Sequence, residues 1–297
     1  MILAITGRAF RSGWTWHAHP DVWALAAALL VAYWAAIRFL GPRRVSAGEP
    51  VVTRRQAALF CMGVAALWVH GDWPIHDISE QYLYSVHMVQ HIGFTLIAPP
   101  LLLLGMPSWL WRWLFVDRPA VNAVVRRVAR PLAAGIIFNT MTVLTHWPVV
   151  VDYSLEHHAS HLAVHVVMFS CAVVMWIPVV NRLPELARPS YPVRMLYLFL
   201  QSVIPTIPAS FLTFGDTVLY RFYAHVPRVF GLSAIDDQQL AGALMKVYAG
   251  TILWVVIAAM FFRWYAREQR PPEPMPEVLT WEHVERAMQQ SEPAAQR

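Results

Sequence analysis

Charged side chains are scarce in this chain. Only 14% of its 297 residues are Asp, Glu, Lys or Arg, whereas an ordinary soluble domain carries about 25%. Hydrophobic residues make up 57% of the chain. This balance excludes an ordinary soluble globular domain and predicts a membrane protein.

Lysine and cysteine are also nearly absent. Lys246 is the single lysine among 23 basic residues, and the two cysteines, Cys61 and Cys171, both lie in apolar runs. Two such cysteines cannot form a secreted disulfide framework, and no Cys/His finger spacing is present. The net charge of +5 comes from Arg residues between long apolar runs. That arrangement indicates membrane topology and no nucleic-acid partner.

Seven apolar stretches approach the roughly 20 residues that a transmembrane helix needs. They are residues 22–40, 56–71, 81–104, 131–151, 157–180, 194–214 and 240–264. Ten-residue segments of alternating polarity, the mark of an outer-membrane barrel, are missing. We therefore predict an all-α integral membrane protein, a seven-transmembrane-helix bundle in which residues 22–264 form the membrane domain and the lipid bilayer is the solvent.

Arginine is distributed unevenly between the two sets of loops. Residues 1–21, 72–80, 152–156 and 215–239 together hold four Arg, whereas the alternate loops hold 16. Because cationic loops resist translocation, this bias predicts an N-terminus outside and a C-terminus in the cytoplasm. Residues 1–21 are then an outer segment, and residues 265–297 are a flexible cytoplasmic tail. The longest outer loop, 215–239, is large enough to form a lid.

Histidines gather on the predicted outer side of the bundle. Those within or beside the predicted helices are His70, His87, His91, His146, His157, His158, His161 and His165. Ionisable groups inside a bilayer are costly and usually functional, so the outer half is the expected functional region. We interpret His17, His19 and His76 as solvated interface residues.

The histidine spacing allows shared ligation. Residues four apart on a helix point within about 40° of each other and lie about 6 Å apart along its axis, so His87 and His91 can share one ion. In the predicted helix over residues 157–180, the four histidines from His157 to His165 share one face.

The histidine face of residues 157–180 continues inward with sulfur-containing side chains. Met168, Cys171 and Met175 follow along the same stripe. Met and Cys in a bundle usually pack, so we interpret this stripe as packing. Met168 and Cys171, together with His70 and Met88, remain secondary ligand candidates.

Imidazoles beside soft sulfur atoms favour copper, particularly Cu(I). Hard cations would need carboxylates, which the predicted helices almost lack, whereas zinc fits as well. The same histidines are compatible with the axial ligation of a b-type haem in electron transfer, or with a proton relay. A metal transporter is a further alternative, because Pro99-Pro100 and Pro205 with Pro208 interrupt two helices and favour a central cavity.

Four segments of the chain form an ordered set of motifs: HMVQHIGFTLIAPPLLLLGMPSWLWR (87–112), THWPVVVD (145–152), HLAVHVVMFSCAVVMWIPVVNRLPE (161–185) and LSAIDDQQLAGALMK (232–246). In this order they resemble the CtaG family of seven-helix assembly factors for cytochrome c oxidase. The resemblance covers about residues 20–265. It implies a non-enzymatic role in maturing a haem-copper oxidase in the bacterial cytoplasmic (inner) membrane. Copper delivery to oxidase subunits is the implied mechanism, with a periplasmic copper chaperone as a candidate donor.

The resemblance also suggests roles for individual residues. The family's histidines fall on His87, His146 and the pair His161 and His165. Its DQ…MK segment falls on Asp237, Gln238 and Lys246, which we expect to serve structure or partner contact. From its sequence position, Lys246 is expected either to pair with Asp236 or Asp237 or to reach the outer interface. His91, His157 and His158 look like additional histidines that would enlarge a metal site.

Overall fold

The structure is a computed structural model. It describes residues 16–186, 188–269, 281, 285, 286 and 288, and within these residues all regular structure is helical. Residues 1–15 of the predicted outer segment, and most of the predicted tail 265–297, lie outside the described residues. The chain divides into two compact units, Met1–Ala258 and Ala259–Arg297. The bundle described below belongs to the first unit, except for residues 259–268 at the end of its last helix.

Six helical segments in the described residues are long and apolar enough to cross a membrane, or seven if one bent pair counts as a span. They are α2 (Pro20–Ala35) with the turns η1 (Ala36–Leu40) and η2 (Gly41–Arg43), α3 (Arg54–Gly71) with α4 (Ile75–Gln81), α5 (Tyr84–Ile92) with η3 (Gly93–Ile97) and α6 (Ala98–Gly105), α11 (His158–Val180), α12 (Tyr191–Val203) with α13 (Thr206–Phe214), and α15 (Ala234–Glu268). The bent pair is α8 (Pro119–Val128) with α9 (Pro131–Thr145), at an angle of 80°. This arrangement agrees with the predicted all-helical, multi-pass membrane protein.

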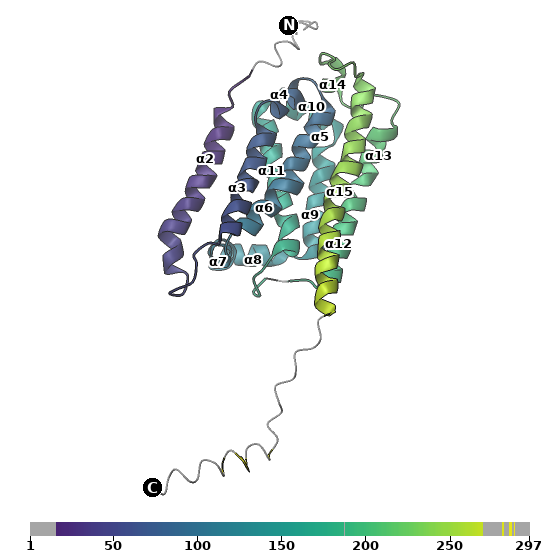
Figure 1. Ribbon diagram of the computed structural model, residues 1–297. Coiled ribbons are helices and arrows are strands. Elements are labelled where there is room, and N and C mark those ends of the chain that lie inside the picture. The colour runs from purple at the N-terminus through teal and green to yellow at the C-terminus, as the bar shows by residue number, and fades with distance from the viewer. Residues whose placement is uncertain (1–15, 187, 270–280, 282–284, 287, 289–297) are drawn as a thin grey trace, which may run out of the picture. The chain divides into compact units, whose positions relative to one another are not determined.

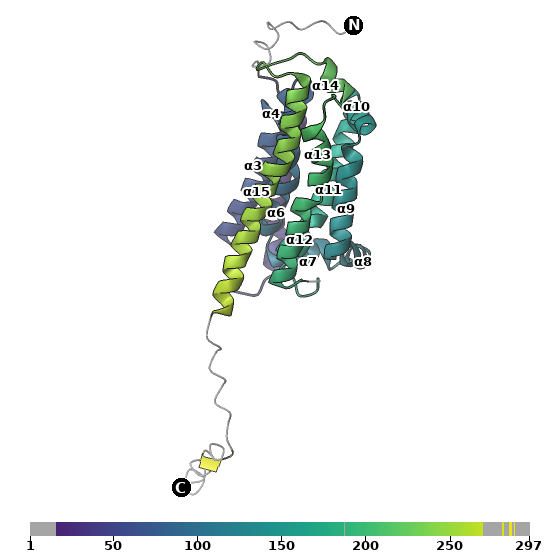
Figure 2. The same ribbon diagram turned by 90° about the vertical axis from the view of Figure 1, so that its right-hand side faces the viewer.

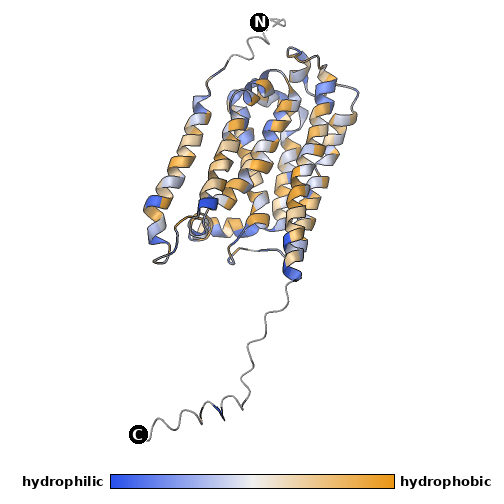
Figure 3. Ribbon diagram, in the orientation of Figure 1, coloured by the Kyte–Doolittle hydropathy of each residue, from blue (hydrophilic) through white to orange (hydrophobic). Residues whose placement is uncertain are grey.

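Short helices close the two ends of the bundle (Figure 1, Figure 2). α4, α10 (Pro148–Glu156) and α14 (Arg221–His225) lie at one end, which we call the histidine end. α7 (Ser108–Phe115) and α8 lie at the other, which we call the arginine end. Hydrophobic residues dominate the middle of the long helices, and hydrophilic residues gather toward both ends (Figure 3).

One predicted helix is shorter than expected. The sequence predicts a continuous helix over 131–151, but α9 ends at Thr145 and α10 begins at Pro148. The prediction is wrong because Pro148 has no backbone N–H to donate and disfavours helical backbone at the preceding residue. The break places His146 at a helix end, facing the bundle.

The predicted interruption at Pro99-Pro100 takes the form of a π-helical turn, η3, between α5 and α6. In a regular helix the N–H of residue 99 would bond to the carbonyl of Thr95, and proline cannot donate that bond. The indole N–H of Trp176 on α11 donates to the Thr95 carbonyl instead, at 2.9 Å. The expected break near Pro205 is likewise confirmed, because α12 ends at Val203 and α13 begins at Thr206.

α3 and α6 approach each other closely through glycine. A Cβ atom on Gly105 would lie 2.5 Å from the backbone nitrogen of Phe60, which no larger residue tolerates. The hydroxyl of Tyr33 on α2 donates to the Gly105 carbonyl at 2.8 Å. These contacts pack α2 and α3 against the helix that continues from the histidine-bearing α5.

Candidate metal centre

The first part of the site is a pair of histidines on α5. The rings of His87 and His91 lie one turn apart with centroids separated by 4.2 Å, and both side chains are buried. The carboxylate of Asp237 accepts hydrogen bonds from the backbone N–H groups of Tyr84 (2.8 Å) and Ser85 (3.0 Å), at the start of this helix. A carboxylate at a helix N-terminus stabilises the helix dipole. Asp237 therefore anchors the helix that carries both histidines.

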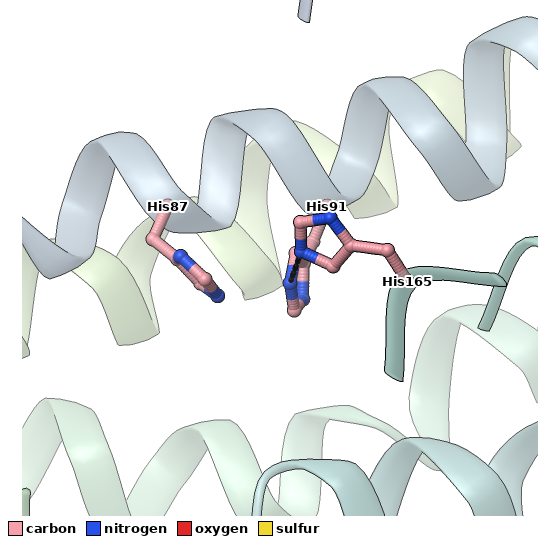
Figure 4. A group of neighbouring side chains, drawn as sticks. All are labelled: His87, His91 and His165. Atoms are coloured by element: carbon pink, nitrogen blue, oxygen red, sulfur yellow. Dashed lines mark hydrogen bonds between the residues drawn. The ribbon is translucent and has the colours of Figure 1, made fainter. Parts of the chain in front are cut away.

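A second pair comes from α11. His161 and His165 are also one turn apart, with ring centroids separated by 4.2 Å. The Nε2 atoms of His91 and His165 are 3.2 Å apart, and the His161 ring is 5.6 Å from that of His87. One nitrogen from each of His87, His91 and His165 lies within 4.8 Å of the other two. Figure 4 shows the α5 rings projecting from one side of their helix, with the His165 ring against that of His91.

His146 completes the group from the end of α9. Its ring centroid is 5.4 Å from that of His91. Its Nδ1 donates to the carbonyl of Thr142 at 2.7 Å, so its Nε2 carries the free lone pair in the neutral ring. We define the histidine cluster as His87, His91, His146, His161 and His165.

Apart from Nε2 of His161, which lies 2.8 Å from a carboxylate oxygen of Glu80, four buried ring nitrogens of the cluster have no hydrogen-bond partner in the described part of the chain. They are Nδ1 of His87, Nδ1 of His91, Nε2 of His146 and Nδ1 of His161. Buried polar atoms nearly always have a partner, and each exception needs an explanation such as a bound ion. A neutral imidazole nitrogen is a common metal ligand. The donor set therefore fits a transition-metal ion.

A carboxylate that sequence analysis did not select adjoins the cluster. Oε1 of Glu80 on α4 lies 2.8 Å from Nε2 of His161 and 3.3 Å from Nδ1 of His76. A signal for this contact exists in the segment HDISE, because His76 and Glu80 are four residues apart and share one helix face. The contact with His161 is between distant parts of the chain, which spacing cannot predict.

Tyrosines cover the histidine end of the cluster. The ring of Tyr84 lies 6.1 Å from that of His87, and the ring of Tyr223 lies 6.3 Å from it. The Tyr84 hydroxyl donates to that of Tyr220 at 3.1 Å, and the Tyr220 hydroxyl donates to the carbonyl of His146 at 3.0 Å. Tyr220 and Tyr223 come from the loop expected to form a lid, so this loop covers the cluster.

Burial changes the acidity of the covering phenols. It raises the pKa of Tyr220 to about 12 and the pKa of Tyr223 well above its ordinary value. Both hydroxyls therefore stay protonated at neutral pH and act as hydrogen-bond donors. The Tyr223 hydroxyl donates to the carbonyl of Ser79 at 2.7 Å, which joins α14 to α4.

A cavity of about 70 Å³ lies beside the cluster. Its lining includes His91 and His146 of the cluster. The lining also includes four thioether side chains, those of Met88, Met168, Met175 and Met245. The sequence interpretation of the sulfur stripe as packing is thus incomplete, because Met168 and Met175 face open space next to imidazoles. Cys171 is half-buried and is not among the described residues that line this cavity.

Three predicted histidines lie outside the cluster. His157 and His158 are exposed on the surface of the bundle. The expectation that His157 shares a face with His161 fails because His157 is the N-cap of α11 and has extended backbone, and its ring stacks on Tyr153. His70 is half-buried: its Nδ1 donates to the carbonyl of Ala66 at 2.8 Å.

The ring of His70 also sets the size of a neighbouring residue. It lies where a Cβ on Gly93 would stand, so glycine is needed there at the start of η3. The interpretation of His19 and His76 as solvated residues is also wrong, since their side chains are only 16% and 19% exposed.

The DQ…MK residues have structural contacts. Asp237 anchors α5, and Gln238 binds the covering loop by accepting from the N–H of Leu219 (2.7 Å) and donating to the carbonyl of Thr217 (3.1 Å). The ammonium of Lys246 lies 4.8 Å from the centre of the Phe214 ring, as in a cation–π contact. Of the two alternatives expected for Lys246, the ion pair with an aspartate does not occur within the described residues.

The chain matches a known family over most of its length. Residues 31–267 match the family described as cytochrome c oxidase caa3 assembly factor (Caa3_CtaG). This range contains the whole histidine cluster, Glu80 and the covering loop.

Curated relatives come from mycobacteria. Uncharacterized proteins of Mycobacterium bovis and Mycobacterium tuberculosis are each 25% identical over 217 residues, which is 63% of this chain and 31% of each relative. One from Mycobacterium leprae is 23% identical over the same shares. The chain therefore spans about a third of the length of the curated relatives it matches. No solved structure matches the chain.

Proposed function

This chain belongs to the cytochrome c oxidase caa3 assembly factor family, and on this basis we propose that it holds copper at the histidine cluster and passes it to an apo-oxidase subunit. The role is non-enzymatic, since copper is cargo and leaves the protein unchanged. The proposed location is the bacterial cytoplasmic (inner) membrane, with the histidine end facing outward, as the arginine bias favours.

The single observation that carries the proposal is the set of buried, unpartnered imidazole nitrogens. Four such nitrogens belong to one cluster built from three helical segments. Keeping them without partners costs stability, and binding a cation would recover that cost. Hydrogen bonds alone do not explain a cluster of five histidines in an apolar bundle.

The neighbouring methionines support copper over zinc. Thioethers bind Cu(I) and are poor ligands for Zn²⁺ or hard cations. Four methionines line the cavity that also reaches His91 and His146. A Cu(I) ion leaving the imidazoles would thus find soft atoms next to them, and weak successive contacts favour transfer over storage.

We favour a single ion over a b haem at this site. The two axial imidazoles of a b haem bind the iron from opposite faces, so the flat macrocycle must fit between their rings. Here the rings of His87, His91, His161 and His165 contact one another. A cavity of about 70 Å³ is also far below the roughly 300–1,000 Å³ of sites for larger organic ligands.

The test is oxidase maturation in cells that carry variants of this protein. Replacing both His87 and His161 with Ala is expected to lower the copper content and activity of the oxidase. The matched control is His157→Ala with His158→Ala, which removes two exposed histidines near the same helix. Normal oxidase copper with the first variant, at equal protein level, would refute copper delivery by the cluster.

A further inference from the structure

A chain of contacting imidazole and carboxylate groups joins the surface of the histidine end to the histidine cluster. We propose that His17, His19, Asp77, His76 and Glu80 form the access path along which a transition-metal cation reaches the cluster. This inference rests on the proposed function and adds residues that neither the family nor the sequence analysis assigns to it.

The path begins at a carboxylate held between two imidazoles. Oδ2 of Asp77 lies 3.2 Å from Nδ1 of His17, and its Oδ1 lies 3.2 Å from Nε2 of His19. His17 is 55% exposed, whereas the Asp77 side chain is 7% exposed. An exposed imidazole thus leads to a buried anion, which is the arrangement that would capture a cation from water.

The next step crosses from the segment before α2 to α4. The ring of His19 packs edge-on against that of His76, with centroids 4.6 Å apart. Nδ1 of His76 lies 3.3 Å from Oε1 of Glu80, one turn further along α4. The amide of Gln90 on α5 also contacts Nδ1 of His76, at 3.2 Å, and this contact positions the ring between the two helices.

The last step delivers the cation into the cluster. The same Oε1 atom of Glu80 lies 2.8 Å from Nε2 of His161. The His161 ring is 4.2 Å from that of His165 and 5.6 Å from that of His87. Each group from His17 to His87 therefore contacts the next, so a cation would never be further than one side chain from a ligand.

The chemistry of the path suits passage more than storage. A cation entering an apolar bundle loses its hydration, which is costly unless ligands and negative charge replace the water. The cluster itself consists of imidazoles, so the two carboxylates would supply the compensating charge along the way. Imidazole with carboxylate accepts first-row transition metals broadly, and conduction requires several sites that each bind weakly.

The rates of metal loading and release distinguish a residue on the access path from a residue that binds the stored ion. A residue on the path lowers the barrier in both directions, so its loss slows loading and release equally and leaves the dissociation constant unchanged. A residue that contacts the stored ion changes the dissociation constant. Negative side chains along a cleft raise the rate of cation association by about tenfold or more.

The experiment measures Cu(I) transfer between a chromophoric chelator and the detergent-purified full chain by stopped-flow absorbance. Asp77→Asn is expected to slow loading and release about tenfold each, with a dissociation constant within about twofold of wild type. The matched control is Asp21→Asn, which removes the same charge from an exposed position close to His19 and is expected to leave both rates unchanged. His76→Gln is expected to behave like Asp77→Asn, and it replaces that variant if Asp77→Asn does not fold.

The outcomes separate the path from the proposed function. Wild-type rates in both variants, with full copper capacity, would overturn the path while the cluster remains the copper site. Slower loading with unchanged release would also overturn it, because the residue would then stabilise the bound ion. A wild-type chain that takes up no Cu(I) would overturn both proposals.

Discussion

At the scale of single residues, the tautomer of His146 makes it ready to bind a metal. A carbonyl can only accept a hydrogen bond, so Nδ1 of His146 must carry the proton that it donates to Thr142. Its Nε2 is left unprotonated, buried and unpartnered. A backbone contact of this kind orients metal-binding histidines and fixes their tautomer.

His146→Gln is therefore expected to weaken Cu(I) binding by at least about tenfold, since even indirect partners of metal ligands are worth 10–100-fold. The control is His225→Gln, because Nδ1 of His225 makes the same contact with the carbonyl four residues before it, at 2.7 Å, but on the surface. Competition with a chelator of known affinity measures the Cu(I) affinity of both variants. Equal affinities in the two variants would remove His146 from the site.

Tyr220 makes the stability of the protein depend on pH in the alkaline range. Its folded-state pKa is about 12, above the ordinary value of 10. Its protonated form therefore contributes stability that is complete below about pH 10 and is lost as the pH rises toward 12. Tyr220→Phe removes that titration and two hydrogen bonds, at a cost of about 1–3 kcal/mol at neutral pH.

The expected result for Tyr220→Phe is a lower thermal midpoint at pH 8 and a shallower loss of stability between pH 10 and 12. Tyr153→Phe serves as the control, because Tyr153 is 55% exposed. If Tyr220→Phe and wild type lost stability in parallel through this range, the hydroxyl would not be buried as described.

At the scale of elements, the position of the start of α5 determines the positions of His87 and His91. Asp237 lies on α15 and is fully buried. Its carboxylate accepts hydrogen bonds from the first two backbone N–H groups of α5. Asp237→Ala leaves both N–H groups without a partner, which we expect to cost roughly 2–4 kcal/mol and to lower copper affinity by displacing His87 and His91.

The neighbouring aspartate provides the matched control for this prediction. Asp236 is exposed, and among the described residues its side chain forms hydrogen bonds with Ser233 at the start of its own helix. Asp236→Ala is expected to cost about 1 kcal/mol, as for the loss of a helix cap, and to leave copper affinity unchanged. Thermal unfolding in detergent measures both variants, and equal destabilisation would contradict the anchoring role of Asp237.

Local patterns predict elements well where one segment suffices. Apolar length predicts most of the long helices, and the i,i+4 spacing predicts that His87 pairs with His91 and His161 with His165. The pattern fails for His157 because it does not reveal where α11 begins. It also fails for Glu80, because a seven-residue polar helix carries no apolar periodicity and its partner His161 lies far along the chain.

At the scale of the whole molecule, orientation follows from arginine. Four Arg at the predicted outer loops against 16 at the inner ones predict that the histidine end faces outward. In a background of Cys61→Ser and Cys171→Ser, a membrane-impermeant maleimide is expected to label His225→Cys in intact bacteria. It is expected to label Arg118→Cys, at the arginine end, only after lysis. The reverse pattern would place the cluster on the cytoplasmic side.

The family and the bundle support different parts of the proposed function. The chain belongs to the cytochrome c oxidase caa3 assembly factor family, and helix packing brings imidazoles from α5, α11 and the end of α9 into one buried cluster. Sequence spacing predicts the pairs on single helices. It could not predict that His146 meets them, because that contact depends on the break before Pro148.

The most direct test is the copper and haem content of the purified full chain after loading with Cu(I), measured by elemental analysis and visible absorption. We expect near-stoichiometric copper in wild type and in the His157→Ala, His158→Ala control, without a Soret band. We expect copper to be lost in the variant His87→Ala with His161→Ala. Copper retained in that variant, or haem in place of copper, would contradict a copper-holding histidine cluster.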